Sequence, residues 1–431
     1  MNATIIKNGV VLTPGKRAER KDIRITGKTI DQIASVIQPT REDSVVDASG
    51  KLVTPGFVNT HTHTGSTLLR GAGGGLPLQE WLRTVMWPAE ATFTETTVRA
   101  ASDLAMAEMI RSGTTMFMDM YHLDMLHLAE RVTEVGMKAV LGRGMIALDG
   151  RWTERLEAAE ELVKTIQSDK SGLLKAAVSP HALYTCPPDF IRKAGELAEK
   201  YDVIRHTHVS ETAQEVQHHL SSHGVSPCRH LHELGFLTPK TVLAHAVHVT
   251  EEELLLLKEN RSAVSHNPRS NLKLGSGVAP VRKMLKSGIP VGLGTDSAAS
   301  NNRLSVLADM QTAALLHAGT EENSTAVQAE DWMSAAWNSG ASMLGFPDSG
   351  RLEEGSAADV VLIRSDRLHM TPDIHERAAD HLLFAAESAD ITDVWSNGKA
   401  LMREGSLLTL DEEKVRAEAE AEWRKIAESN V

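Results

Sequence analysis

Residues 53–63, VTPGFVNTHTH, form an apolar run that ends in two histidines two positions apart. Short apolar runs of this kind recur along the middle of the chain, and longer segments with helical periodicity alternate with them. The runs that we predict as strands are 53–60, 115–119, 138–143, 174–179, 203–209, 241–245, 262–266 and 289–295. Polar residues, among them several histidines, follow many of these runs directly.

Helical periodicity fits eight segments, and Thr250 with Glu253 has the spacing of a capping box before one of them. Eight βα units within about 290 residues favour an α/β fold, a (β/α)8 barrel of the TIM type, although a doubly wound sheet gives a similar order. In a barrel, functional side chains gather at the C-terminal ends of many strands, whereas an open sheet gathers them at its switch point. The predicted helices are 95–111, 123–135, 154–168, 188–200, 212–222, 251–259, 279–287 and 303–317.

The two ends of the chain show a different, β-rich pattern. Residues 4–13 place the turn dipeptide Asn8-Gly9 between two β-branched runs, which predicts a hairpin. Residues 391–402 repeat this pattern around Asn397-Gly398, and the segments 21–33 and 358–363 are also strand-like. The ends are therefore expected to pair with each other.

We predict that residues 1–56 and 346–431 build one small β-sandwich domain, and that residues 57–345 form the barrel. Residues 411–428 have alternating charges and predict a terminal helix, which we assign to the small domain.

The composition excludes several classes of protein. The chain has 431 residues, with 45 Lys and Arg against 57 Asp and Glu, and a formal net charge of −12. Net acidity without a basic run argues against binding to nucleic acid. No stretch has the roughly 18 to 20 unbroken apolar residues of a membrane helix, and the N-terminus lacks a signal-peptide pattern, so we expect a cytoplasmic protein. Cys186 and Cys228 lie far apart and suggest neither a disulfide framework nor a thiolate zinc site.

Four residues at strand ends are candidate metal ligands. His61 and His63 point to the same face if they lie on a strand, so both imidazoles can reach one ion. His208 ends the fifth predicted strand, and Asp296 follows the eighth. The alternatives are loop hydrogen bonds for the histidines and a helix cap at Asp296-Ser297.

Two further residues could move protons. Glu211 lies three positions beyond His208, and His245 closes the sixth strand, with His248 shortly after it. The alternative for Glu211 is a carboxylate that interacts with a helix dipole. The alternative for His245 and His248 is an ordinary core histidine.

Taken together, these positions agree with a barrel that carries its active site at the strand ends. Three imidazoles and a carboxylate suit zinc or iron(II), and such an ion lowers the pKa of a water that it binds. The fourth strand carries Lys175 near its start and ends in Ser179-Pro180-His181, so it places no lysine where it could bridge two metals. We therefore expect one divalent metal per subunit, with zinc preferred to iron.

These residues resemble the amidohydrolase superfamily over nearly the whole chain. Longer motifs resemble the deaminases of methylthioadenosine and S-adenosylhomocysteine within it, and triazine chlorohydrolases are related. The matching motifs are PGFVNTHTH at 55–63, LLRG at 68–71, SHNP at 265–268, SNLKLG at 270–275, GTD at 294–296 and DSAASNN at 296–302, together with the His208 to Glu211 segment and His245.

The resemblance implies a hydrolytic deaminase of adenine nucleosides with one metal held by His61, His63, His208 and Asp296. It implies that Glu211 protonates the adenine ring, and that His245 and Asp296 accept the proton of the attacking water. A nucleoside is the implied substrate, and related enzymes often form homo-oligomers.

Substrate contacts also follow from the resemblance. Glu90 matches a ribose-diol ligand, and His181 matches a purine contact, although the chain has Ala182-Leu183 where the family has Ser-Pro. Arg143 and Arg155 match positions that hold the homocysteine carboxylate, and a solvated helix residue is the alternative for Arg155. The apolar side chains that could line the thioether end of the pocket, or equally belong to the core, are Leu78, Trp81 and Trp87.

Two other functions stay open at this point. One is an aminohydrolase or chlorohydrolase for another N-heterocycle, such as guanine, a cytosine-like base or a chlorotriazine, which has no diol or carboxylate for Glu90 and the arginines. The other is a non-enzymatic metal-binding barrel, which the proton-transfer candidates Glu211 and His245 argue against.

Overall fold

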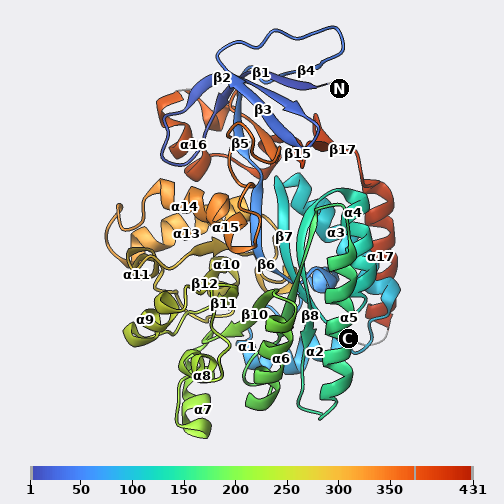
Figure 1. The fold of residues 1–431 in the computed structure, drawn as a ribbon, viewed down its shortest axis with the longest axis vertical. Helices are drawn as coiled ribbons and strands as arrows, with labels where there is room; N and C mark the ends of the chain where they lie inside the picture. Colours follow the sequence, from blue (N-terminus) through green and yellow to red (C-terminus); the bar gives the residue numbers. More distant parts are fainter. Residues whose placement is uncertain (1–2, 373–374, 429–431) are drawn as a thin grey trace.

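The computed structural model describes residues 3–372 and 375–428, and its larger part is a ring of eight parallel strands (Figure 1). An isolated parallel bridge between Thr62 and Asp296 joins the end of the first strand of this ring to the loop after the last strand. The predicted (β/α)8 barrel is therefore confirmed. Its strands are β6 (Phe57–Thr62), β7 (Thr114–Tyr121), β8 (Lys138–Met145), β9 (Leu174–Pro180), β10 (Ile204–Val209), β11 (Thr241–His245), β12 (Ala263–His266) and β13 (Val291–Leu293).

Each of the eight predicted helices is present within a few residues of its expected bounds. Thr250 and Glu253 form the predicted capping box before α9, with each side chain bonded to the other residue's backbone N–H. The helices of this part are α3 (Glu95–Arg111), α4 (Met125–Val135), α5 (Trp152–Ser168), α6 (Pro188–Lys200), α7 (Ala213–His223), α8 (Pro227–Glu233), α9 (Glu251–Glu259), α10 (Pro268–Lys273), α11 (Val281–Lys286), α12 (Ala298–Asn301), α13 (Val306–Thr320), α14 (Ala329–Ala336) and α15 (Asn338–Met343).

A short helical insertion stands between β6 and α3. It contains the 3₁₀ helix η1 (Thr64–Leu69), α1 (Leu78–Trp81), the π-helical turn η2 (Leu82–Met86) and α2 (Trp87–Glu90). Sequence periodicity did not predict these pieces, since each is only four to six residues long.

The predicted strand 53–60 is wrong in one respect, because it divides at Gly56. Residues before the glycine form β5 (Lys51–Pro55), which pairs in the small domain, and β6 starts directly after it in the barrel. A Cβ at Gly56 would lie 2.1 Å from Oγ1 of Thr115, so only glycine allows the chain to pass this close to β7.

The two ends of the chain build one small β domain, seen at the top of Figure 1. Its nine strands form one sheet that curls around a core containing residues of β2 and β3 and Trp395 of β15. The small β domain predicted from the two chain ends is thus confirmed, as a single curled sheet. The strands are β1 (Thr4–Val11), β2 (Glu19–Thr26), β3 (Thr29–Ala34), β4 (Ser44–Asp47), β5, β14 (Val360–Arg364), β15 (Ile391–Ser396), β16 (Lys399–Arg403) and β17 (Ser406–Leu407).

Of the two hairpin turns predicted at Asn-Gly dipeptides, the structure contains one. Asn397-Gly398 makes the predicted tight turn between β15 and β16, with φ of 51° and 77°. The hairpin predicted at Asn8-Gly9 is wrong, because β1 runs straight through it and the dipeptide forms a register shift against β2. A Cβ at Gly9 would lie 2.3 Å from Cγ2 of Val53, so close packing against β5 accounts for the glycine.

The terminal helix α17 (Glu412–Glu428) is present as predicted, but it packs on the barrel helix α3. Oγ1 of Thr97 donates a hydrogen bond of 2.9 Å to the Glu422 carboxylate at this contact.

The domain limits at residues 56/57 and 345/346 stay a prediction. In the described part of the chain, no helix is long and apolar enough to cross a membrane. The remaining short helices are η3 (Leu368–Met370), η4 (His375–Arg377), α16 (Ala378–Phe384) and η5 (Ser388–Asp390).

A buried ion pair ties the barrel to the small β domain. Nζ of Lys138, at the start of β8, lies 2.6 Å from the Asp359 carboxylate, and the side chains are 3% and 1% exposed. The same ammonium donates to Oγ of Ser349, and the second Asp359 oxygen accepts the backbone N–H of Asn397. Both charges are thus paired and hydrogen-bonded, as buried charges must be.

Lys138→Ala is expected to destabilise the protein by about 3–5 kcal/mol, because it leaves the Asp359 carboxylate buried without a cation. Urea unfolding followed by circular dichroism measures this loss. The matched control is Lys16→Ala, which breaks the exposed pair with Glu353 and should cost no more than about 1 kcal/mol. Equal effects of the two substitutions would contradict the structural role of the buried pair.

Candidate active site

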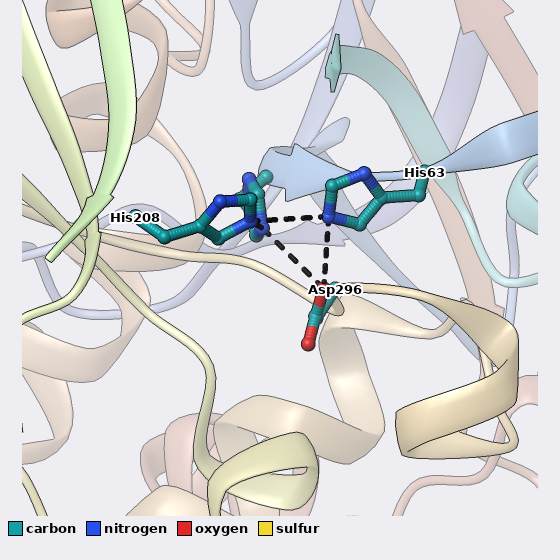
Figure 2. Close-up of side chains that lie close together, drawn as sticks. His63, His208 and Asp296 are labelled. Atoms are coloured by element: carbon teal, nitrogen blue, oxygen red, sulfur yellow. Dashed lines mark hydrogen bonds and ion pairs between the residues drawn. The ribbon is translucent and has the colours of Figure 1, made fainter. Parts of the chain in front are cut away.

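The four predicted metal ligands converge at the C-terminal ends of the barrel strands. His61 ends β6 and His63 follows it, while His208 lies in β10 and Asp296 follows β13. The ligand atoms of all four lie within 4.8 Å of one another. Figure 2 shows the rings of His63 and His208 and the Asp296 carboxylate pointing toward the same space.

The spacing of these atoms is regular. Nε2 of His208 lies 3.2 Å from Nε2 of His61 and 3.3 Å from Nε2 of His63. Oδ1 of Asp296 lies 3.4 Å and 3.2 Å from the same two histidine atoms. Ligand bonds of about 2.0–2.2 Å around one ion produce separations close to these.

The tautomers of the three histidines follow from their other ring nitrogens. Nδ1 of His63 donates to the Met120 carbonyl at 2.6 Å, and Nδ1 of His208 donates to the His181 carbonyl at 2.7 Å. Nδ1 of His61 lies 2.8 Å from Nε2 of His206, whose own Nδ1 bonds to the Val242 carbonyl at 2.7 Å. A neutral His206 must therefore accept from His61, which leaves all three Nε2 lone pairs facing the common space.

Asp296 is held by its second oxygen. Oγ of Ser270 and Oγ of Ser300 donate to Oδ2 at 2.5 Å and 2.8 Å, so Oδ1 is turned toward His61 and His63. Ser297 caps α12 through its own side chain, which excludes the simple capping explanation for the carboxylate.

The charges of this group are strongly coupled. Burial disfavours the Asp296 carboxylate, but its contacts with the rings of His61 and His63 outweigh the burial and hold the pKa of Asp296 well below its usual range. Burial also opposes a charge on His63, yet contact with Asp296 raises the pKa of His63 to about 9. A metal ion that binds here therefore displaces a proton from His63.

The donor set fits a divalent zinc-like ion. Three neutral imidazoles and one carboxylate oxygen are the ligands that zinc and iron(II) accept, and the hydrogen bonds behind the rings match the support that metal-binding histidines require. The four residues would hold one ion.

Glu211 and His245 lie beside this group and are almost fully buried. Nε2 of His245 lies 3.7 Å from Oε2 of Glu211, and Oγ of Ser276 donates to Oε1 of Glu211 at 3.2 Å. On its other side, Nδ1 of His245 meets Oδ1 of Asn271 at 2.8 Å. Burial raises the pKa of Glu211 above its usual range, although the neighbouring His245 opposes the rise.

Glu215, which the sequence analysis did not identify, fixes the turn that carries Glu211. Its two carboxylate oxygens accept the backbone N–H groups of Ser210 and Glu211 at 2.9 Å and 2.7 Å. Thr212 caps α7 next to it, so Glu211 itself is not the cap. Ser210 has a φ of 49°, and the Glu215 contacts stabilise this strained position.

A cavity of about 740 Å³, which includes its opening to solvent, is lined by His63, His208 and Asp296 of the metal-ligand group. Glu90 and His181, both predicted as substrate contacts, line it, and Leu78, Trp81 and Trp87 from the helical insertion supply an apolar wall. Its further lining residues include Tyr121, His122, Tyr184, Glu211, His245 and Leu274.

Glu90 is anchored inside this cavity by Tyr121, whose hydroxyl donates to Oε1 at 3.0 Å. Burial raises the pKa of Glu90 to about 7, although the Tyr121 hydrogen bond opposes the rise. His181 bonds through Nδ1 to Oγ1 of Thr185 at 2.9 Å, so its Nε2 stays available on the cavity side.

The two predicted arginines lie outside the residues that line the cavity. Arg143 is half-buried on β8, and burial together with the positive charge of Arg155 lowers its pKa. Arg155 makes two hydrogen bonds of 2.7 Å and 2.8 Å to the Asp149 carboxylate, so its guanidinium is already paired. The structure therefore brings Glu90 and His181 to the metal-ligand group and leaves the arginines near each other but farther out.

Several supporting residues have no signal that single-sequence analysis could use. His206 lies two residues before His208 on β10, and its spacing alone does not show that it supports His61. His248 bonds to the Ser276 carbonyl instead of lining the cavity. Ser270, Ser300 and Asn271 lie in stretches quoted for the resemblance, but nothing in their residue types shows which atom each one orients.

Comparison with known proteins agrees with this geometry. The profile of the amidohydrolase family matches residues 52–401. The chain belongs to the amidohydrolase family. It is 44% identical over 437 residues to the 5-methylthioadenosine/S-adenosylhomocysteine deaminase of Halalkalibacterium halodurans, covering 99% of each chain.

Two further members of the family are similar over nearly the full length. The 5′-deoxyadenosine deaminase of Methanothermobacter thermautotrophicus is 40% identical, with 97% of this chain and 98% of the relative covered. A crystal structure of an adenosine deaminase from Xanthomonas campestris with bound zinc superposes with a TM-score of 0.94 at 30% identity, covering 99% of both chains. The predicted family is thus confirmed.

His206→Phe should lower the affinity of the protein for zinc by about 10- to 100-fold, because His61 loses the acceptor that fixes its tautomer. Competition with a chromophoric chelator measures the affinity. His248→Phe is the control, since His248 bonds to a backbone carbonyl away from the ligands. An unchanged affinity in His206→Phe would show that this hydrogen bond does not support the metal site.

Proposed function

We propose that this protein is a metal-dependent aminohydrolase that deaminates adenine nucleosides. The reactions are S-adenosylhomocysteine to S-inosylhomocysteine and 5′-methylthioadenosine to 5′-methylthioinosine, each with release of ammonia. The observation that carries the proposal is one cavity that combines a four-residue ligand set with Glu211, His245 and the Tyr121-anchored Glu90. The names of the similar deaminases support the same substrate class.

His61, His63, His208 and Asp296 would hold the ion, which we expect to be zinc, with iron(II) as the alternative. When bound, a divalent ion of this kind lowers the pKa of a coordinated water and supplies a nucleophile at neutral pH. The zinc in the similar adenosine deaminase supports this choice of metal.

The residues of this chain then manage the protons. Glu211, whose pKa is raised by burial, donates a proton to the ring nitrogen next to the carbon that bears the amine. His245 and Asp296 accept the proton that the attacking water loses. A proton returned to the amine nitrogen lets the C–N bond break, and ammonia leaves.

Glu90 binds the ribose diol in this proposal. Its carboxylate has spare acceptor capacity, because among the described residues only Tyr121 donates a hydrogen bond to it. Arg143 and Arg155 remain our proposed contacts for the amino-acid carboxylate of S-adenosylhomocysteine, with Arg155 sharing its guanidinium with Asp149. The apolar wall of Leu78, Trp81 and Trp87 suits a thioether at the 5′ position.

The alternative substrates fit the cavity less well. A free base or a chlorotriazine has no diol, so binding it would leave the half-buried Glu90 without a ligand partner. A non-enzymatic metal-binding barrel would need no buried acid and histidine beside the ligands, whereas Glu211 and His245 lie 3.7 Å apart at that place.

Ammonia release from 5′-methylthioadenosine and S-adenosylhomocysteine by the zinc-loaded protein tests the activity, and Glu211→Gln is the decisive variant. We expect Glu211→Gln to keep its zinc and to lose activity by about 10²- to 10⁴-fold, because glutamine has no proton to donate. The zinc content of each sample is measured in parallel. Release of ammonia from guanine only, or full activity in Glu211→Gln, would overturn the proposed reaction or the proposed acid respectively.

Glu90→Gln is expected to reduce kcat/KM for adenosine by about tenfold to a hundredfold, the effect of one hydrogen bond to a charged group. The control substrate 2′,3′-dideoxyadenosine lacks both hydroxyls, so the variant and the parent should use it equally. In the parent, kcat/KM for adenosine should also fall below a pH of about 7, where the Glu90 carboxylate gains a proton, and this limb should be absent for the dideoxy substrate. Parallel losses on both substrates would assign Glu90 a structural role.

A further inference from the structure

A second group of histidines lies outside the active site, on the helices α7 and α8. His219 and His223 are four residues apart in α7, so they lie on the same face of that helix. His230 of α8 faces them, and its Nδ1 lies 2.9 Å from Nε2 of His219. The function proposed above uses none of these three residues.

The three rings are as close as those of the active-site ligands. Their centroids are 4.4 Å, 5.1 Å and 5.3 Å apart. The corresponding distances among His61, His63 and His208 are 4.7 Å, 4.8 Å and 5.3 Å. The nitrogens of the new group converge less closely, because only the active-site group has all its ligand atoms within 4.8 Å among the described residues.

The third ring, that of His223, differs from the other two in its exposure. His219 is buried and His230 half-buried, and the hydrogen bond between them fixes their relative position. His223 is exposed at the C-terminal end of α7, where Gly224 ends the helix, so its ring is free to turn toward the pair. Rotation of this one side chain would bring a third nitrogen to the other two.

The local charges favour neutral rings, which is the form that binds metals. Burial and the neighbouring rings of His223 and His230 lower the pKa of His219 to about 4. Burial and His223 also lower the pKa of His230, against the opposing charge of Glu233. Both rings are therefore neutral at neutral pH, and the hydrogen between Nε2 of His219 and Nδ1 of His230 would move to another ring nitrogen when both atoms bind an ion.

We propose that His219, His223 and His230 form a second metal site, which takes a borderline divalent ion such as Zn²⁺ and joins α7 to α8. An i, i+4 histidine pair with a third imidazole from a neighbouring helix suits such ions, with water in the remaining position. The site is separate from the active site and does not depend on the proposed reaction.

The position of the site suggests what a bound ion would stabilise. Glu215, which fixes the Ser210-Glu211 turn, lies one helical turn before His219 in α7. Across the gap, Ser226 at the start of α8 donates to the Glu253 carboxylate of the α9 capping box. An ion shared by α7 and α8 would connect these two anchored helix starts.

The test uses the full-length protein without a histidine tag and with its active site already loaded with zinc. Equilibrium dialysis against micromolar Zn²⁺, followed by elemental analysis, should give two zinc ions per chain. His223→Ala should bind the second ion at least about tenfold more weakly, since even the loss of an outer-shell partner weakens a metal site by that factor. Deaminase activity should stay at the parental level in this variant and shows that it is folded.

His218→Ala is the matched control, because His218 is the exposed neighbour of His219 and has no ring contact with the three among the described residues. The His218→Ala variant should retain the second ion. His230→Ala, which removes the half-buried ligand, should weaken its binding as His223→Ala does. A stoichiometry of one zinc in the parent would overturn the proposal. So would a second zinc that persists in both His223→Ala and His230→Ala, because it would then lie elsewhere on the surface.

Discussion

The active site depends on one geometric constraint, namely that three imidazole lone pairs and one carboxylate oxygen must face a single point. Each imidazole meets it by giving its Nδ1–H to an acceptor: the Met120 carbonyl for His63, the His181 carbonyl for His208, and the ring of His206 for His61. Two of the ligands are thus oriented by backbone carbonyls on or just after an adjacent strand, and His61 by a side chain of β10. His61 and Asp296 come from the two extreme strands of the sheet order, so they can meet only because the sheet closes. An open doubly wound sheet would hold them apart.

Bringing the ligand and proton-transfer candidates together strains the backbone at several positions. Ser210, His245, Ala246 and Asp296 all have positive φ values between 48° and 73°. None of them is glycine, and each such conformation costs on the order of 1–3 kcal/mol. Buried side chains offset this by holding the strained turns: Glu215 accepts both N–H groups beside Ser210, and two serines fix Asp296. Strain of this kind is stable only because the apolar core around the barrel is extensive.

The sequence predicts the barrel well because its strands are apolar runs and its chemistry stands where those runs end. That signal is local, and it identifies His61, His63, His208, Glu211, His245 and Asp296 without knowledge of their neighbours. It fails where tertiary pairing decides the conformation. The same Asn-Gly dipeptide turns the chain at 397–398 but not at 8–9, because β1 is held between β2 and β5 and continues through the dipeptide. Likewise, the pairing of Arg155 with Asp149 and the role of Glu215 depend on which atoms meet in space, and residue spacing alone carries no information about this.

The candidate reaction centre and the wall of the cavity come from different parts of the chain. The barrel strands supply the ligand set and the proton-transfer residues, and their positions are dictated by strand ends and closure. Leu78, Trp81, Trp87 and Glu90, by contrast, all come from the short helical insertion between β6 and α3, which forms one wall of the cavity. This insertion contributes no residue to the metal-ligand group. It can therefore vary in sequence without disturbing the ligands, and a shared reaction centre can serve different ring substrates when this wall changes. In this chain the wall combines an apolar surface with one half-buried carboxylate, and the proposed substrate, a hydroxylated sugar with an apolar substituent, would match that combination.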